Sequence, residues 1–183
     1  MSIPRPLHHS SWSRSSLPSW SRLEFPPSGW IALNTDGAVS NSTSLGSTAG
    51  LLRGSLGNWL GGFSKSLGIT SPVHAEFEGL KLAWSQGYEK VQCQVDSSDV
   101  FNMVSYANAR SSPLSLARSI ASLRDRGWAI EYKLILRDAN VAADIIAKSS
   151  LRQTPAQMFL DSAPSFLQNT LGNDISSLFN TAH

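Results

Sequence analysis

Four acidic residues, Asp36, Glu76, Asp96 and Asp144, stand where the surrounding pattern predicts burial or the edge of a buried element. An unpaired buried carboxylate costs several kcal/mol, so such an acid needs a cation or a strong hydrogen-bond donor nearby. Clustered carboxylates without His or Cys are ligands that suit magnesium or manganese. The four residues therefore favour a site for two divalent ions, which can flank a phosphodiester bond during hydrolysis.

Each acid also has a purely structural interpretation. Asp36 precedes Gly37, a pair that is common in turns. Asp96 could cap the helix that follows it, and Glu76 and Asp144 could compensate helix dipoles. The order of the four favours the metal site: an acid at a strand end, one in a helix, one at the next strand end and one at the start of a last helix.

The elements that would carry these acids can be read from periodicity. Three strands, at 30–36, 47–53 and 58–67, are separated by short Gly- and Ser-bearing turns, as in an antiparallel meander. A helix follows from Ser71-Pro72 to Gly87 and places Glu76 on its apolar face. A strand at 90–95 then ends at Asp96 and leads into a helix near Ser98, which indicates a parallel crossover.

The remaining elements complete a mixed α/β domain. A helix is expected from Pro113 to Gly127, a strand at 128–136, and a last helix that Asn140 caps and that runs to about Leu151. Neighbouring strands lie about 4.8 Å apart, so parallel pairing of the first and fourth strands would bring Asp36 and Asp96 side by side. Like charges so close need a metal between them.

Four sequence blocks carry a family resemblance in this order: Leu33-Asn-Thr-Asp-Gly-Ala38, His74-Ala-Glu-Phe-Glu78, Val95-Asp-Ser97 and Arg137-Asp-Ala-Asn-Val-Ala-Ala-Asp-Ile-Ile-Ala-Lys148. Over about 30–151 the chain resembles the plant reverse-transcriptase-like branch of the ribonuclease H family, which includes remnants of non-LTR retroelements. The resemblance implies a ribonuclease H-like fold with a five-stranded mixed sheet, three antiparallel strands followed by parallel ones, flanked by helices.

The same resemblance implies a hydrolase that cuts the RNA strand of an RNA/DNA hybrid endonucleolytically with two magnesium or manganese ions. Asp36, Glu76, Asp96 and Asp144 take the catalytic and metal-ligand positions. RNA would be distinguished by contacts to the 2′-hydroxyl in the minor groove. The candidates for nucleic-acid binding are Gly37, Asn41, His74, Ser97 and Asn140.

Two features depart from well-known active members of the family. The loop 136–139 contains no histidine, which in those enzymes assists proton handling and product release. The basic helical extension that grips the hybrid has no counterpart between Phe101 and Trp128. We therefore expect slow turnover and weak substrate affinity. Two alternatives stay open: a non-catalytic nucleic-acid-binding or protein-contact module of the same fold, and an exonuclease or integrase of the same superfold.

Composition sets the outer limits. With 183 residues, 41% hydrophobic content and a net charge of +2, the chain can form one domain with tails. The single cysteine, Cys93, excludes an internal disulfide and favours a reducing compartment, with nucleus or organelle possible. Membrane spanning and secretion are not expected, and we expect a monomer.

The two ends of the chain differ from its centre in texture. Residues 1–29 are rich in Ser, Pro and Arg and lack periodicity, so we expect a flexible leader or linker, with an organellar transit peptide as the alternative. The domain is expected at 30–151. Pro155, Pro164 and Gly172 interrupt short apolar groups in 152–183, which predicts a tail that is loosely packed or partly disordered.

Overall fold

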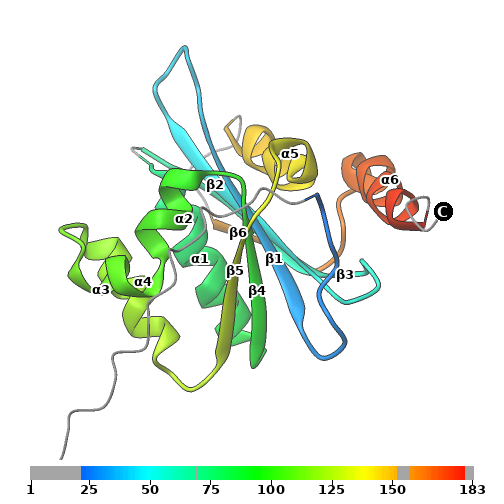
Figure 1. Ribbon diagram of the computed structural model, residues 1–183. Helices are drawn as coiled ribbons and strands as arrows, with labels where there is room; N and C mark the ends of the chain where they lie inside the picture. Colours follow the sequence, from blue (N-terminus) through cyan, green and yellow to red (C-terminus); the bar gives the residue numbers. More distant parts are fainter. Residues whose placement is uncertain (1–21, 69, 152–156, 180–183) are drawn as a thin grey trace, which may run out of the picture.

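The computed structural model describes residues 22–68, 70–151 and 157–179 and contains one mixed sheet flanked by helices (Figure 1). The strand order is β5-β4-β1-β2-β3-β6. Strands β1, β2, β3 and β6 pair antiparallel, whereas β4 pairs parallel with both β1 and β5. The strands are β1 (Ile31–Val39), β2 (Gly46–Arg53), β3 (Trp59–Leu67), β4 (Lys90–Val95), β5 (Ala129–Leu134) and β6 (Gln157–Leu160).

The helices lie on both sides of this sheet (Figure 1). The helices are α1 (Pro72–Ser85), α2 (Ser98–Val104), α3 (Tyr106–Ser111), α4 (Ser115–Arg124), α5 (Val141–Ser150) and α6 (Gln168–Phe179), with short 3-10 turns η1 (Arg137–Ala139) and η2 (Ser165–Leu167). No helix in the described part of the chain is long and apolar enough to cross a membrane.

Strand alternation divides the core into two layers, because successive side chains point to opposite faces of a sheet. Leu33 of β1 and Leu52 of β2 are buried in the cluster that contains α1, α2 and α4. Ala49 and Leu51 of β2 point the other way and pack against α5. Each side chain of β1 therefore faces either the layer of α1, α2 and α4 or the layer of α5.

Helix α1 approaches β1 closely because Gly79 has no side chain. A Cβ atom at Gly79 would lie 2.9 Å from Leu33 Cδ1 and 3.0 Å from Thr35 Cγ2. Both distances are shorter than ordinary van der Waals contact, so a larger residue would push the helix outward. The close approach brings the buried face of α1, including Glu76, against β1.

A ladder of buried polar side chains crosses the α5 face of the sheet. Asn34 Nδ2 donates to Gln94 Oε1 at 3.1 Å, and Arg53 Nη2 donates to Asn34 Oδ1 at 2.9 Å. Arg53 is only 1% exposed, and its Nη1 lies 2.6 Å from Asp174 Oδ2 on α6. Because buried polar groups need partners, this ladder pairs the sheet with Glu24 on one side and with Asp174 of α6 on the other.

The N-terminal segment is more ordered than the sequence predicts. Of the leader expected at 1–29, residues 1–21 lie outside the described residues, but Leu23 is buried with Ile135 and Ala139. The carbonyl of Glu24 accepts from Gln94 Nε2 at 2.7 Å, and Phe25 packs beside Leu23. The prediction of a flexible leader or linker is therefore wrong for Leu23 to Phe25, because isolated apolar residues can be buried without periodicity.

The C-terminal tail also differs from its prediction within the described residues. Strand β6 pairs with β3 and makes the sheet six-stranded instead of five-stranded. Leu167 and Leu171 are buried against α5. These residues fill the layer beside α5 that a short domain would leave exposed. Residues 152–156 and 180–183 lie outside the described residues.

Candidate functional site

Asp36 and Asp96 lie at the same edge of the sheet. Strands β1 and β4 run parallel and are paired up to Asn34 and Gln94, and each acid follows two residues after that pair. The carboxyl edge of parallel strands is where open α/β sheets bind ligands. A cavity of about 10 Å³ lies here, roughly the room of one water-sized sphere. Its lining residues are Thr35, Asp36, Pro72, Val95, Asp96, Ser97 and Val100.

The carboxylate of Asp36 is electrostatically strained. Burial, followed by the negative charge of Asp96 and then that of Asp144, raises its pKa from 3.8 to about 7. The amide of Gly37, which donates to Asp36 Oδ1 at 2.7 Å, and the positive charge of Arg137 oppose this rise in pKa. Like charges and desolvation both disfavour the ionised form, which a bound cation would restore.

Asp144 reaches this edge from the first turn of α5. The side chain of Asn140 donates to the carbonyl of Thr35 at 2.9 Å and fixes the start of the helix beside β1. The negative charge of Asp144 contributes, after burial and Asp96, to the raised pKa of Asp36. Lys148 Nζ lies 2.6 Å from Asp144 Oδ2 and neutralises it.

Glu76 is fully buried on the α1 side of the sheet. Its Oε2 accepts from Thr35 Oγ1 at 2.9 Å, and Cys93 and Tyr132 lie toward the same carboxylate. Burial raises the pKa of Glu76, and the surrounding donors oppose that rise. Thr35 faces α1, so the next residue, Asp36, faces α5. Glu76 and Asp36 therefore belong to opposite layers.

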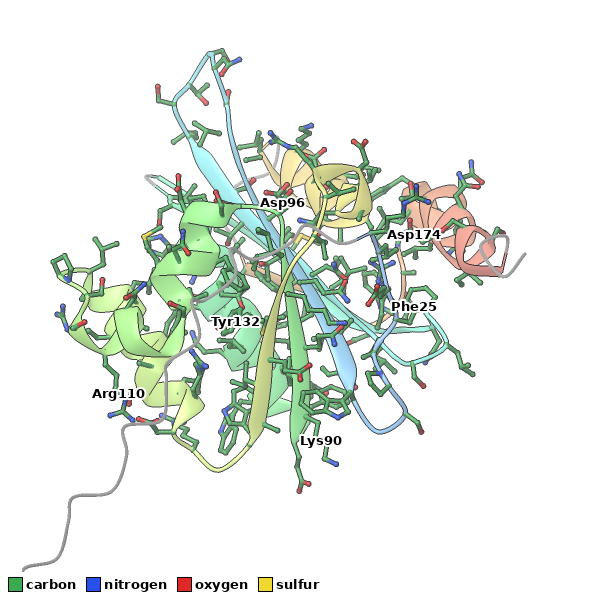
Figure 2. The ribbon with its side chains drawn as sticks, viewed as in Figure 1. Phe25, Lys90, Asp96, Arg110, Tyr132 and Asp174 are labelled. Atoms are coloured by element: carbon green, nitrogen blue, oxygen red, sulfur yellow. The ribbon has the colours of Figure 1, made fainter. Side chains whose placement is uncertain are left out.

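In Figure 2, Asp96 lies at the upper edge of the sheet near α5, and Tyr132, which faces Glu76, lies lower, beside α1 and α4. The structure thus groups Asp36, Asp96 and Asp144 at one edge and places Glu76 next to them through Thr35. Within the described residues, no three His, Cys, Asp or Glu side chains are close enough to hold one ion together.

The donor chemistry nevertheless fits magnesium or manganese. All four acids offer oxygen, the ligand that both ions prefer. Among the described residues, six buried side-chain atoms lack a hydrogen-bond partner, and the two that belong to carboxylates are Asp36 Oδ2 and Glu76 Oε1. Buried polar atoms are nearly always satisfied, so these two oxygens point to a missing partner on each side of Thr35.

Comparison with known proteins places this geometry in a family. Residues 34–150 match the family model described as reverse transcriptase-like. The chain belongs to the reverse transcriptase-like family. An Arabidopsis thaliana protein named as a candidate ribonuclease H is 31% identical over 154 residues, which are 81% of this chain and 25% of the relative. The chain thus spans about a quarter of that relative's length. The family predicted from the sequence is confirmed.

Solved structures identify the fold. The N-terminal RNase H domain of a Mycobacterium tuberculosis protein superposes with a TM-score of 0.58 and 17% identity over 67% of this chain and 93% of that chain. An RNase H1 isolated from compost was solved in complex with an RNA/DNA hybrid. This complex superposes with a TM-score of 0.55 and 19% sequence identity, over 65% of this chain and 94% of that chain. The reverse transcriptase-like domain therefore has the ribonuclease H-like fold predicted from its sequence.

The structure places four of the predicted nucleic-acid contacts as follows. The amide of Gly37 is used by Asp36, and Ser97 Oγ accepts from the backbone of Val100 at the start of α2. His74 Nδ1 lies 3.2 Å from Ser71 Oγ at the start of α1. Asn41 is exposed in the turn that joins β1 to β2.

Asn140 does not fit a nucleic-acid contact in this structure. It is 1% exposed, and its amide nitrogen is engaged by the carbonyl of Thr35. It occupies the N-cap position of α5, but its side chain makes no capping hydrogen bond. Because the amide of Asn140 donates to β1, it neither caps α5 nor faces a nucleic acid.

Two residues near the site were not singled out from the sequence. Arg137 supplies positive charge near Asp36 from the loop that lacks a histidine. Thr35 contacts both Glu76 and Asn140. The signal for Arg137 was its place at the start of the last sequence block. Thr35 lies in the first sequence block, but a threonine in a strand is ordinary, so nothing in its type indicated a role.

Proposed function

We propose that this domain is a metal-dependent endonuclease that hydrolyses the RNA strand of an RNA/DNA hybrid. The observation that carries the proposal is the meeting of Asp36, Asp96 and Asp144 at the carboxyl edge of the sheet, with the pKa of Asp36 raised to about 7. A carboxylate that is costly to ionise is suited to bind a cation. Family membership and the candidate ribonuclease H relative support the nuclease assignment.

The roles of the acids follow from their positions. Asp36 and Asp96 line the small cavity and would both be ligands of the metal ions. Asp144 would bind from the α5 layer after exchanging Lys148 for metal, and Glu76 would bind from the α1 layer. Two magnesium or manganese ions, when bound, would supply an activated water and stabilise the departing sugar oxygen.

The loop 136–139 sets the expected rate. Without a histidine there, protonation of the leaving group is left to solvent, and general acid–base help is typically worth about a hundredfold to ten-thousandfold. The positive charge of Arg137, which acts on Asp36, would also favour an approaching phosphate. The proposed enzyme is therefore slow but active.

The substrate class rests on the fold and on small polar groups around the site. An RNase H1 with this fold was solved with an RNA/DNA hybrid. Ser97 borders the cavity beside Asp96, and Gly37 and His74 lie close by in the sequence to Asp36 and Glu76. Short polar groups of this kind can contact a 2′-hydroxyl in a wide minor groove, which duplex DNA lacks.

A non-catalytic nucleic-acid-binding module is the second candidate. The observation that favours it is the ion pair of Asp144 with Lys148, together with the absence, among described residues, of three acids in range of one ion. In that case Lys148 would replace the metal as the permanent partner of Asp144, and the fold would bind nucleic acid without cutting it.

The deciding experiment uses three duplexes of one sequence, RNA/DNA, DNA/DNA and RNA/RNA, each labelled at one end, with magnesium or manganese. We expect internal RNA fragments from the hybrid alone, no cutting with EDTA, and loss of cutting in Asp96→Asn. The matched control is Asp99→Asn, an exposed acid three residues further along. A folded, metal-bound protein that leaves the hybrid intact supports the module, and stepwise loss of end nucleotides indicates an exonuclease.

A further inference from the structure

Thr35 is a junction between the elements that carry the acids. Its hydroxyl donates to Glu76 Oε2 on α1 at 2.9 Å. Its backbone carbonyl accepts from Asn140 Nδ2, at the start of α5, at 2.9 Å. The next residue in β1 is Asp36, and Thr35 itself lines the cavity between Asp36 and Asp96. One residue thus touches or adjoins three of the four proposed ligand-bearing segments.

We propose that Thr35 is the positioning residue of the metal site, holding Glu76 and the start of α5 in register with Asp36. The inference rests on the proposed function, because positioning has a consequence only if the acids bind metal. Thr35 is 5% exposed, so it orients other groups and is poorly placed to contact a large substrate itself.

The hydroxyl side of the junction fixes Glu76. The hydroxyl of Thr35 donates to Oε2 of this carboxylate, whose other oxygen, Oε1, is buried without a hydrogen-bond partner among the described residues. A donor of this kind selects the side-chain orientation of an acid and leaves its second oxygen available. Groups that hold metal ligands in this way typically change metal affinity by about tenfold to a hundredfold when removed.

The distance between α1 and β1 makes this contact possible. Gly79 lies one turn after Glu76, and an added Cβ there would come within 3.0 Å of Thr35 Cγ2. The missing side chain lets the helix settle at the distance that the hydrogen bond requires. The methyl group of Thr35 therefore packs against α1 while its hydroxyl reaches Glu76.

The carbonyl side of the junction fixes α5. Asn140 is 1% exposed and gives its amide to Thr35 rather than to the backbone of its own helix. Asp144 follows one turn later on α5. Because the peptide group of Thr35 is rigid and planar, movement of Asn140 would be passed to β1 at the residue before Asp36.

The test measures manganese affinity by calorimetry in Thr35→Val, Thr35→Ser and Thr48→Val, at a temperature where each metal-free protein is folded. Thr48→Val is the matched control, because Thr48 is buried on β2 and its hydroxyl has no partner among the described residues. We expect Thr35→Val to bind about tenfold to a hundredfold more weakly, with Thr35→Ser and Thr48→Val close to wild type.

A merely structural role would lower the melting temperature of metal-free Thr35→Val and leave the manganese affinity of the folded protein unchanged, and this result would overturn the inference. If Thr35→Val does not fold, Asn140→Ala replaces it, with weaker manganese binding expected and unchanged binding contradicting the inference. Wild-type protein that binds no manganese would remove the proposed metal site and this inference together. Wild-type binding that Thr35→Val retains would remove the inference alone.

Discussion

Lys148 Nζ lies 2.6 Å from Asp144 Oδ2, one turn further along α5. The ammonium supplies the positive charge that a metal ion would otherwise bring to this acid. Because the lysine side chain is 65% exposed, the pair is accessible to solvent and contributes little to stability. If Asp144 binds metal as proposed, Lys148 would compete with that metal, and its removal would cost the fold little.

Lys148→Gln should tighten manganese binding, because Asp144 is released and one repulsive positive charge is removed from the site. We expect a gain of a few-fold in affinity by calorimetry, equivalent to an exposed pair worth less than about 1 kcal/mol. The control is Lys81→Gln, which removes another lysine that is paired with an acid on its own helix; Glu78 on α1 keeps its second partner, Lys65. Weaker binding in Lys148→Gln than in the control would contradict competition.

The stability of the metal-free protein should depend on pH through Asp36. The folded state holds this proton up to about pH 7, whereas the unfolded chain releases it near pH 3.8. Between these values the unfolded state binds fewer protons, so the contribution of Asp36 to the free energy of unfolding falls as pH rises and levels off above about 7. Urea denaturation in the presence of EDTA, between pH 4 and 8, should show that the free energy of unfolding falls less with pH in Asp36→Asn than in wild type. Equal slopes would refute the raised pKa of Asp36.

The buried pair of Arg53 and Asp174 should hold α6 to the sheet. Asp174→Asn leaves Arg53 charged at 1% exposure. Breaking a buried ion pair from one side typically costs about 3 kcal/mol or more. Asp125→Asn, which breaks the exposed pair with Arg110, should cost less than about 1 kcal/mol. Urea denaturation compares the two, and similar losses would show that α6 does not depend on Arg53.

Leu23 should stabilise the domain although it lies before the first strand. It is 7% exposed and packs with Ile135 and Ala139, beside the loop that precedes α5. Leu23→Ala should lower the free energy of unfolding by about 2 kcal/mol or more, as in other apolar cores. Leu56→Ala, at a residue that is 79% exposed, is the control. Equal melting temperatures for the two variants would rule out docking of this segment.

Sequence periodicity was sufficient for the elements that bury a regular face. The strand expected at 90–95 and the helix that carries Glu76 form as predicted, as does the parallel pairing of β1 with β4. Strand β6 has only four residues and helix α6 is rich in Ser, Asn and Gly, so neither was predicted from the sequence. Strand β6 is placed by its pairing with β3, and α6 is paired with the sheet through Arg53 and Asp174, partners 121 residues apart. No local sequence pattern reveals such distant partners.

The sequence predicted the elements on which the four acids lie, but not the relative orientation of the acids. Asp36 follows Thr35 in a strand, so their side chains face different layers. Because Glu76 accepts a hydrogen bond from Thr35, Glu76 lies in the layer opposite to Asp36. Asn140 was expected to cap a helix, which is what its type and position indicate, but its amide goes to β1. The hydrogen-bond partner of a buried amide depends on which carbonyl lacks a donor after the elements have packed, and the sequence does not show this.

The central claim, that the acidic edge binds divalent metal through Asp36, is tested most directly by manganese calorimetry at pH 8, where Asp36 is ionised. Wild-type protein and Asp99→Asn should bind manganese with similar affinity, and Asp36→Asn, which keeps the shape and removes the charge, should lose the binding. No binding by folded wild-type protein, or equal binding by Asp36→Asn, would contradict the claim.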